Sequence, residues 1–337
     1  MITLGVVVPC YNEEDVLQEA TRRLLGTLGE LITGGRIREK SRIYYVDDGS
    51  TDGTWALIES LSRNNERVAG IKLSRNRGHQ NALLAGLFTA PGDALISLDA
   101  DLQDDVSAIS AMVDEFAKGA EIVYGVRESR NTDGFFKRST AQAFYRVMNL
   151  LGVEVVYNHA DYRLMSRRAI EALQDYKEVN LFLRGVVPLI GFRSAQVYYK
   201  RAERHAGKSK YPLKRMLAFA FEGIASFSVT PLRLITGLGL LVFAITMLMS
   251  VYILCVKLFT DATVPGWTST VLPMYILGGI QLFCTGIIGE YLGKMYQEVK
   301  ARPRYIIDKC INFPEVAAPL VYTTSPCVEP STKTLPL

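Results

Sequence analysis

The sequence predicts an α/β protein with a doubly wound, mostly parallel sheet, followed by a helical hairpin. Short apolar runs alternate with segments of helical periodicity through the first half of the chain. Polar clusters come directly after three of these apolar runs. Hydrophobic residues make up 49% of the 337 residues, and the longest apolar stretches lie near the C-terminus.

The expected elements follow one another as strand and helix in turn. Such an order implies parallel strands in one sheet, with helices on both faces. Ligands of these sheets bind beyond the carboxyl ends of the strands, where the polar clusters of this sequence lie. We expect strands at 2–8, 42–46, 68–73, 94–98 and 121–124, and helices at 13–28, 52–61, 80–89 and 106–118.

The first polar cluster follows the first strand and contains Pro9, Tyr11 and Glu13. The Tyr11 ring can stack on a nucleotide base, and Glu13 can accept hydrogen bonds from a base or ribose. A helix start explains the same residues, with Asn12 as its cap and the acids favoured by the helix dipole. This cluster alone decides nothing.

The second cluster follows the second strand and begins with Asp47 and Asp48. A carboxylate at a strand end can bind ribose hydroxyls or a base nitrogen. The alternative is a turn followed by a capped helix, for which Ser50 and Thr51 are candidate caps. Both interpretations stay open on local grounds.

The third cluster, Asp99-Ala100-Asp101-Leu102-Gln103, follows the fourth strand. Carboxylate and amide oxygens suit Mg²⁺ or Mn²⁺, which use one or two carboxylates together with waters and substrate phosphates. A metal at this point would neutralise a nucleotide diphosphate. A solvated acidic loop is the alternative, but the apolar run leads directly into the acids and favours a site.

A basic stretch with Arg204 and Lys210 precedes the longest apolar segments. Arginine offers a planar fork for phosphates and lysine a point charge. Attraction to anionic lipid explains the same charges. The segment 211–231 that follows is amphipathic and fits a membrane interface.

Two apolar segments, at about 234–256 and 268–289, are long enough to span a bilayer as helices. Basic residues lie mainly outside this pair, which predicts a multi-pass membrane protein with both termini in the cytoplasm. The expected organisation is a catalytic domain at 1–210, the juxtamembrane segment at 211–231, the hairpin at 232–289, a cytoplasmic segment at 290–313 and a disordered tail at 314–337. The net charge of +4 gives no reason to expect nucleic acid.

The motifs together resemble a known family. VVVPCYNEEDVL, YYVDDGSTDGT, LSRNRGHQNALLAGL, SLDADLQDD and ERHAGKSKY occur in the order found in the GT-A glycosyltransferases of family 2. The chain most resembles their polyprenyl-phosphate branch, which includes dolichyl-phosphate mannose synthase, and within it the bactoprenol glucosyltransferases of O-antigen modification in lipopolysaccharide. The resemblance covers roughly residues 2–310 and implies a GT-A fold. It also implies a multi-pass protein of the bacterial inner (plasma) membrane, with the catalytic domain and both termini in the cytoplasm.

The resemblance also implies roles for individual residues. The metal would be held by Asp101 and Gln103, with Asp99 near the ribose or the metal. Arg204 and Lys210 would close over phosphates, and Asp161 would act on the acceptor side in the least defined role. The expected nucleotide-sugar contacts are Pro9, Tyr11, Glu13, Asp47, Asp48, Asp99, Ala100, Arg127 and Lys210, and the expected catalytic residues are Asp99, Asp101, Asp161 and Arg204.

The implied reaction is an inverting, metal-dependent transfer of a sugar, expected to be glucose from UDP-glucose, to polyprenyl (undecaprenyl) phosphate. The nucleophile is an already ionised phosphate oxygen, so no strong general base is required. The lipid bilayer and a second copy of the chain are further expected partners. The alternatives are the same chemistry with mannose or an aminoarabinose derivative, and a non-catalytic membrane transport component.

Overall fold

The computed structural model describes residues 1–127, 159–178, 183–200 and 266–313, with isolated positions between 235 and 248. The chain divides into two compact units, which we treat separately. The first comprises Met1–Thr140, Val155–Lys210 and Pro303–Leu337, and the second Ala141–Glu154 and Tyr211–Arg302.

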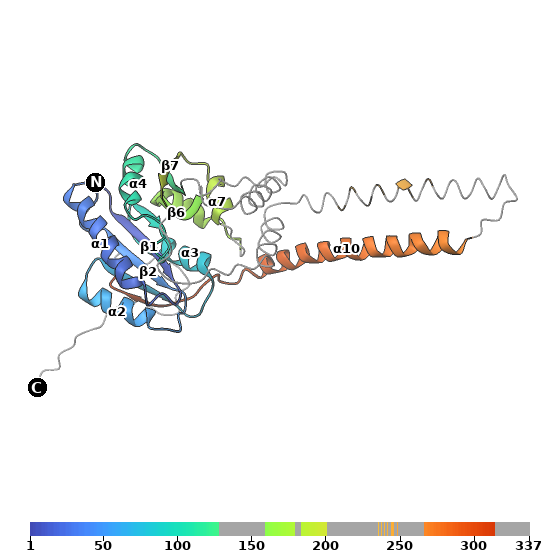
Figure 1. The fold of residues 1–337 in the computed structure, drawn as a ribbon, viewed down its shortest axis with the longest axis horizontal. Coiled ribbons are helices and arrows are strands. Elements are labelled where there is room, and N and C mark those ends of the chain that lie inside the picture. Colours follow the sequence, from blue (N-terminus) through green and yellow to red (C-terminus); the bar gives the residue numbers. More distant parts are fainter. Residues whose placement is uncertain are drawn as a thin grey trace, which may run out of the picture. The chain divides into compact units, whose positions relative to one another are not determined.

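Eight strands form one sheet in the described part of the first unit (Figure 1). The strands are β1 (Leu4–Cys10), β2 (Arg42–Asp47), β3 (Val68–Leu73), β4 (Ala94–Ser97), β5 (Ile122–Arg127), β6 (His159–Ser166), β7 (Ser194–Tyr199) and β8 (Ile307–Ile311). Their order is β7-β5-β6-β4-β1-β2-β3-β8. The helices of this unit are α1 (Leu17–Thr33), α2 (Thr54–Asn64), α3 (His79–Thr89), α4 (Ala108–Ala117), α6 (Arg167–Gln174) and α7 (Leu183–Leu189).

The α/β class and the first five strands are confirmed, but the sheet is mixed rather than mostly parallel. Strands β4, β1, β2 and β3 run parallel to one another, and so do β5 and β7. Strand β6 runs antiparallel to both β4 and β5, and β8 runs antiparallel to β3. The apolar runs revealed the parallel strands, whereas β6 carries His159, Asp161 and Arg163 and lacks such a run.

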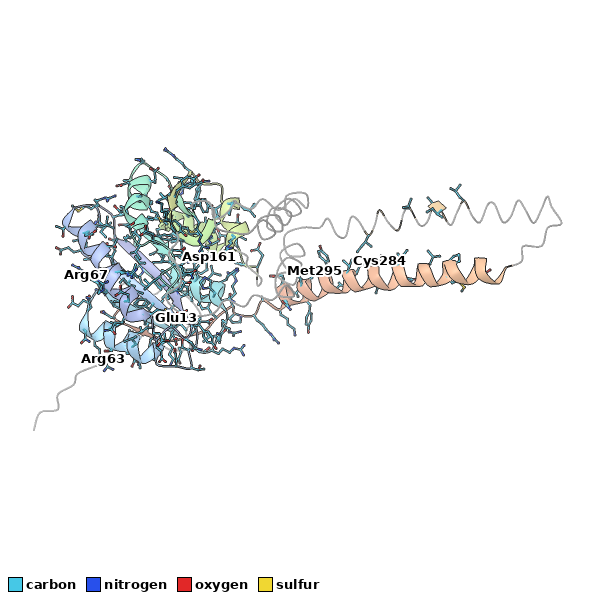
Figure 2. The ribbon with its side chains drawn as sticks, viewed as in Figure 1. Glu13, Arg63, Arg67, Asp161, Cys284 and Met295 are labelled. Carbon is cyan, nitrogen blue, oxygen red and sulfur yellow. The ribbon has the colours of Figure 1, made fainter. Side chains whose placement is uncertain are left out.

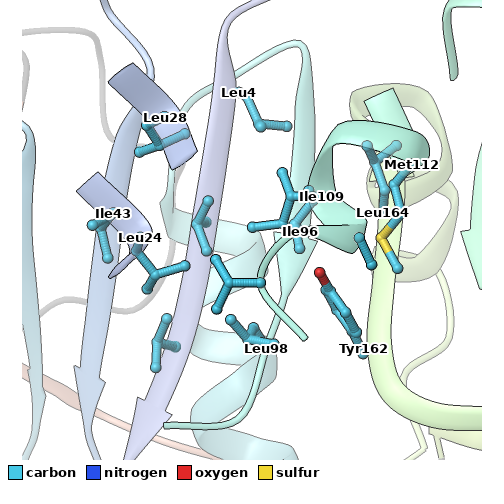
Figure 3. Close-up of a cluster of buried hydrophobic side chains, with 14 of the residues drawn as sticks. Leu4, Leu24, Leu28, Ile43, Ile96, Leu98, Ile109, Met112, Tyr162 and Leu164 are labelled. Carbon is cyan, nitrogen blue, oxygen red and sulfur yellow. The ribbon is translucent and has the colours of Figure 1, made fainter. Parts of the chain in front are cut away.

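The core on one face of the sheet lies between the strands and helices α1, α2 and α4. Every residue of β1 is buried, as expected for a strand covered on both faces. Its side chains at Leu4, Val6 and Val8 belong to the same hydrophobic cluster as Leu24 of α1 and Ile109 of α4. Figure 3 shows these layers around Leu4, Leu24 and Ile109. This packing fixes the end of β1, where the first polar cluster begins.

Helix α3 covers the opposite face, and its residues from Ala82 to Phe88 are all buried. Its backbone approaches the sheet closely at Gly86. A methyl group there would come within 2.3 Å of Val7 Cγ1 and 2.8 Å of Val46 Cγ2. This close approach sets the depth at which α3 lies, and with it the position of His79 at the first turn of the helix.

The edge strand β8 brings residues 307–311 into the sheet, in a segment where we expected no strand. Asn312 follows it and donates its side-chain amide to the Val68 carbonyl oxygen at 2.7 Å. Lys309 also pairs with Glu59 of α2 at 2.7 Å. The segment from Ile307 to Asn312 therefore covers the β3 edge of the sheet.

The described part of the second unit is mainly α10 (Trp267–Lys300), a helix of 34 residues (Figure 2). The predicted two-span location in a bacterial inner membrane is contradicted, because no helix among the described residues is both long and apolar enough to cross a bilayer. Helix α10 covers the second predicted span, 268–289, and continues past Glu290 and Lys294 to Lys300. The first predicted span, 234–256, lies outside the described residues except at isolated positions.

Replacing Gly86 by alanine should destabilise the protein, because the new methyl group would overlap Val7 and Val46. Overpacking a core of this kind costs about 1–3 kcal/mol. The matched control is Gly26→Ala in α1, where a methyl group meets nothing within 4 Å. That change should stabilise by about 0.5–1 kcal/mol through helix propensity. Chemical denaturation measures both, and equal effects would contradict the packing described for α3.

Candidate active site

Hydrogen bonds between two turns build one wall of the site. The backbone N–H of Asn12, after β1, donates to Ser50 Oγ at 3.0 Å, and Thr51 N–H donates to Asn12 Oδ1 at 2.9 Å. Glu13 N–H donates to Thr54 Oγ1 at 2.9 Å. Asn12 has a φ of 57° and does not cap α1, which begins only at Leu17. The polar residues after β1 and β2 therefore join the two turns rather than start helices.

The paired acids at the end of β2 have different surroundings. Asp48 accepts the backbone N–H groups of Arg77 and Gly78 at 2.7 and 2.8 Å, so both of its oxygens hold the turn before α3. Asp47 accepts one N–H from Ser50 at 3.3 Å, and its buried Oδ2 atom has no partner. Burial raises the pKa of both carboxyls. Asp48 is therefore a structural residue in this state, and Asp47 keeps an unused acceptor.

The turn after β4 presents the third cluster. Asp101 Oδ1 accepts the backbone N–H of Gln103 at 3.1 Å. Between them Leu102 has a φ of 56°, a left-handed conformation that is uncommon for leucine. The turn is therefore sharply bent between Asp101 and Gln103, the two side chains expected to hold a metal. Gln103 is buried, with 5% exposure.

Asp99 faces His79, which comes from the first turn of α3. The His79 Nε2 atom lies 3.4 Å from Asp99 Oδ1 and 3.9 Å from Asp161 Oδ2. Burial is the main cause that raises the pKa of Asp99 to about 6. His79 opposes this rise, and the carboxylate of Asp161 adds to it. The ionised form of Asp99 is thus costly in the unliganded protein.

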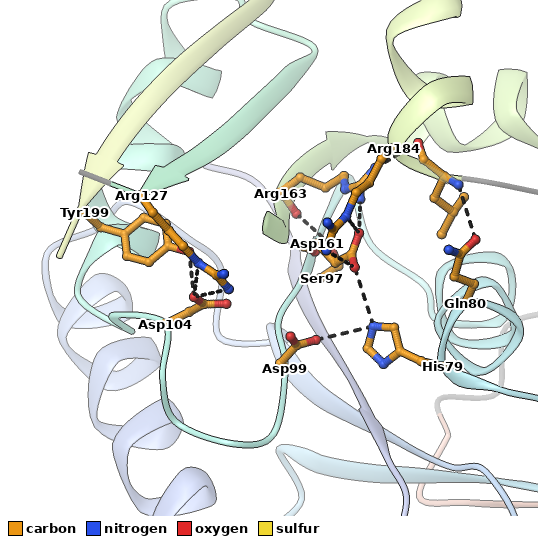
Figure 4. Close-up of polar contacts among 11 residues, drawn as sticks. His79, Gln80, Ser97, Asp99, Asp104, Arg127, Asp161, Arg163, Arg184 and Tyr199 are labelled. Carbon is orange, nitrogen blue, oxygen red and sulfur yellow. Dashed lines mark hydrogen bonds and ion pairs between the residues drawn. The ribbon is translucent and has the colours of Figure 1, made fainter. Parts of the chain in front are cut away.

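Asp161 on β6 is shared by two arginines (Figure 4). Arg163 Nη2 donates to Asp161 Oδ1 at 2.7 Å, and Arg184 Nη2 of α7 donates to Asp161 Oδ2 at 3.0 Å. Burial disfavours the carboxylate, but the two guanidinium groups outweigh it and hold the pKa of Asp161 well below its usual range. Asp161 is therefore a permanent anion at neutral pH.

A second ion pair involves Arg127 at the end of β5. Asp104 Oδ1 accepts from Arg127 Nη2 at 3.1 Å and from the Tyr199 hydroxyl at 2.6 Å. Asp104 is buried, and its Oδ2 atom has no partner. The expected sugar-nucleotide contact Arg127 is thus held by an acid that follows the D-x-D sequence by three residues, a role that sequence reasoning missed.

The structure brings most of the predicted residues to one edge of the sheet. Strands β4, β1 and β2 are neighbours, so Asp99, Pro9 and Asp47 lie at adjacent carboxyl ends. Tyr11 is half-exposed, with 46% exposure. Figure 2 labels Glu13 and Asp161 within the first unit. Arg204 and Lys210 lie outside the described residues.

Sequence reasoning gave no role to His79, Arg163 or Arg184. His79 lies in the glycine-containing motif before α3, and Arg163 is two residues after Asp161 on the same strand. Both were visible in the motifs. Arg184 lies in none of the recognised motifs, and its pairing with Asp161 arises only when the fold brings α7 beside β6.

Known proteins resemble this chain over most of its length. The family model described as glycosyl transferase family 2 matches residues 5–174. The uncharacterized glycosyltransferase YkoT of Bacillus subtilis is 54% identical over 90% of this chain and 91% of its own. The SfII prophage-derived bactoprenol glucosyl transferase of Shigella flexneri is 38% identical over 91% and 97%. Glucosyl-3-phosphoglycerate synthase from Mycobacterium tuberculosis, a solved structure, shares 21% identity over 66% of this chain and 77% of its own, with a TM-score of 0.42.

The protein is a glycosyltransferase. More particularly, the chain belongs to glycosyl transferase family 2, because the family model covers half of it and relatives above 30% identity span nearly all of it. The family match ends at Gln174 and so includes Asp99, Asp101 and Asp161 but not Arg184.

Replacing Asp99 by asparagine should stabilise the unliganded protein at pH 7.5 while lowering activity. The folded-state pKa of about 6 lies above the ordinary value of 3.8. At neutral pH Asp99 is ionised in both states, and its charge is less favourable in the folded protein than in the unfolded chain, so it lowers the free energy of unfolding. After discounting for solvent screening, we expect a gain of about 1–2 kcal/mol.

The stabilisation expected from Asp99→Asn should depend on pH. As the pH falls below 6, Asp99 is protonated in the folded protein and the cost disappears, so most of the gain should be lost by pH 4. Unfolding midpoints of wild type and Asp99→Asn at the two pH values measure it. A destabilised variant at pH 7.5 would contradict the assigned surroundings of Asp99.

Proposed function

We propose that this glycosyltransferase moves glucose from UDP-glucose to polyprenyl phosphate, with undecaprenyl phosphate as the acceptor, and inverts the anomeric carbon. The observation that carries the proposal is the similarity to bactoprenol glucosyl transferases along nearly their whole length, 97% of the Shigella flexneri protein. The carboxylates at the strand ends and the arginines that pair with Asp104 and Asp161 support it, since two anionic substrates must meet there. Use of the product in O-antigen or other envelope glycans stays a prediction of the resemblance.

The donor would bind at the carboxyl ends of β1, β2 and β4. Tyr11 offers a half-exposed ring for the base, and Asp47 offers its unpartnered buried oxygen as an acceptor. Pro9, Glu13, Asp48 and Ala100 would line this pocket, in which Asp48 acts by holding the turn at Arg77 and Gly78. We propose that Arg204 and Lys210 approach the phosphates, as the family resemblance implies.

The oxygen atoms of Asp99, Asp101 and Gln103 fit a hard divalent cation, Mg²⁺ or Mn²⁺. No three His, Cys, Asp or Glu side chains of the described residues form a metal site by themselves. Two carboxylates and an amide nevertheless suit an ion that completes its shell with water and substrate phosphate oxygens. When bound, such an ion would neutralise the diphosphate as it leaves.

The transfer needs little proton chemistry. A phosphate oxygen of the acceptor forms the new bond to the anomeric carbon, while the bond from that carbon to the diphosphate oxygen breaks and its electrons leave with the nucleoside diphosphate. The attacking oxygen is already ionised near neutral pH, so no group has to remove a proton from it. The protein chiefly positions the two substrates and offsets their repulsion.

Asp161 is then an orienting anion rather than a general base. Its two arginine partners hold its pKa far below neutrality, so it has little tendency to accept a proton. Its position between Arg184 and His79 allows it to fix both groups. This assignment fits a nucleophile that arrives deprotonated.

Chelating divalent ions should abolish transfer, and Asp101→Asn should lower turnover at least ~100-fold, as for removal of a central electrostatic group. The matched control is Asp105→Asn, since Asp105 is exposed and its side chain accepts the backbone N–H of Ser107, just before α4. That variant should keep near wild-type turnover. Full activity of the wild type in excess chelator would rule out the metal.

The proposed reaction is tested with purified protein, undecaprenyl phosphate and a series of labelled nucleotide sugars. We expect label from UDP-glucose to enter the organic phase as a β-linked glucosyl phosphate lipid. Preferred label from GDP-mannose or from an aminoarabinose donor would favour the same chemistry with another sugar. Donor binding without transfer from any sugar would contradict the proposal and favour a binding component.

A further inference from the structure

Three polar side chains form a closed triangle at the end of β5. Arg127 Nη2 donates to Asp104 Oδ1 at 3.1 Å, and Arg127 Nε donates to the Tyr199 hydroxyl oxygen at 3.2 Å. The Tyr199 hydroxyl donates in turn to Asp104 Oδ1 at 2.6 Å. Each side chain therefore contacts the other two, and two separate partners fix the direction of the guanidinium group.

The members of the triangle come from distant parts of the chain. Asp104 lies in the turn after β4, whereas Arg127 ends β5 and Tyr199 ends β7. The parallel pairing of β5 with β7 places Arg127 opposite Tyr199. The ring of Tyr162 on β6 packs edge-on against that of Tyr199, with 5.3 Å between the ring centroids. The Tyr162 hydroxyl also donates to the Asp105 carbonyl oxygen at 3.1 Å. These contacts tie the turn after β4 to β5, β6 and β7.

The ion pair within the triangle is buried at one end only. The Asp104 side chain is 1% exposed and the Arg127 side chain 24%. The hydrogen bonds that Asp104 accepts all reach Oδ1, and its buried Oδ2 atom accepts none in the described part of the chain. A buried ion pair contributes little net stability, because both charges lose their hydration. The direction that Asp104 gives to Arg127 explains this pair better than the stability it adds.

Arg127 lies at the same edge of the sheet as the proposed donor site. Strand β6 is antiparallel to both β4 and β5, so β4 and β5 run in the same direction and their carboxyl ends share one edge. Figure 4 shows Asp99 and Asp104 along one turn, with Arg127 and Tyr199 beside Asp104. A partly exposed guanidinium group at this edge can donate paired N–H groups to a phosphate.

We infer that Asp104 and Tyr199 are positioning residues that hold Arg127 for the diphosphate of the nucleotide sugar, an inference that rests on the proposed function. A freely rotating arginine would lose side-chain freedom when the donor binds, and the triangle removes most of that loss beforehand. The turn after β4 then serves the donor in two ways, since Asp101 lies where the metal is expected and Asp104 directs the arginine.

The test measures UDP-glucose binding to the full-length protein by calorimetry in the presence of Mn²⁺. Arg127→Gln should raise the Kd about 10- to 100-fold, the range for a lost hydrogen bond to a charged group. Asp104→Asn and Tyr199→Phe should raise it about 3- to 20-fold, because Arg127 remains but is no longer held. The matched control is Tyr45→Phe, which removes a buried tyrosine hydroxyl bonded to Thr21 of α1 at 2.7 Å and should leave the Kd unchanged.

A double-mutant cycle separates positioning from a general structural role. If Asp104 acts through Arg127, Asp104→Asn should change the Kd less than about twofold in a protein that already carries Arg127→Gln. An acid with a merely structural role would weaken binding by the same factor in both backgrounds. Tyr199→Phe keeps the buried ring and gives the same cycle if Asp104→Asn does not fold.

Michaelis constants for the two substrates give a second measurement, with a water-soluble short-chain isoprenyl phosphate as acceptor probe. Asp104→Asn and Tyr199→Phe should raise the donor KM and change the acceptor KM less than about threefold. A Kd that no variant changes, additive effects in the cycle, or a rise confined to the acceptor KM would overturn the inference and leave the proposed function standing.

Failure of the proposed function gives a different pattern. If the wild type binds UDP-glucose and the cycle is non-additive, but no polyprenyl phosphate accepts the sugar, the proposed acceptor is wrong and the role of Arg127 holds. If the wild type does not bind UDP-glucose, the proposed donor is wrong, and the inference fails with it.

Discussion

The ion cluster at Asp161 is the interaction on which the site depends. A buried charge is tolerated only when it is paired, and this carboxylate is paired with a residue of its own strand and with residues of two helices. Arg163 lies beside it on β6, Arg184 comes from α7, and His79 from α3. Gln80, next to His79, also accepts the backbone N–H of Leu183 at 3.4 Å. The cluster therefore fixes α3 and α7 against the sheet, and removal of its central charge would leave buried arginine unpaired.

The strand order gives the cluster its chemical setting. Because β4 lies beside β1, and β1 beside β2, three turns with acidic side chains meet at one edge. The side chains of Asn12 and Asp48 accept backbone N–H groups that join the turns after β1 and β2 to each other and to the turn before α3. Antiparallel β6 enters beside β4 and places Asp161 next to Asp99. One edge of the sheet thus presents acidic side chains from three turns beside the buried ion cluster at Asp161.

The sequence predicted the parallel part of the fold because each strand there is a buried apolar run, and every residue of β1 is indeed buried. It did not predict β6, whose polar residues form the site, or β8, whose alternation with Asp308 and Lys309 is weak. Asp99 and Asp101 were found because they follow such a run directly. Arg184 was missed because its pairing with Asp161 exists only in the folded chain. The two apolar segments predicted a membrane hairpin, and the described helices do not bear it out.

We expect the nucleotide sugar and a divalent metal to bind together at the carboxyl ends of β1, β2 and β4. The most direct measurement is an experimental structure of the protein with Mn²⁺ and UDP-glucose, in which anomalous scattering locates the metal. Mn²⁺ should lie beside Asp99 and Asp101, with UDP-glucose at these strand ends. A metal remote from these carboxylates, or a donor bound away from the three strand ends, would contradict the proposed site.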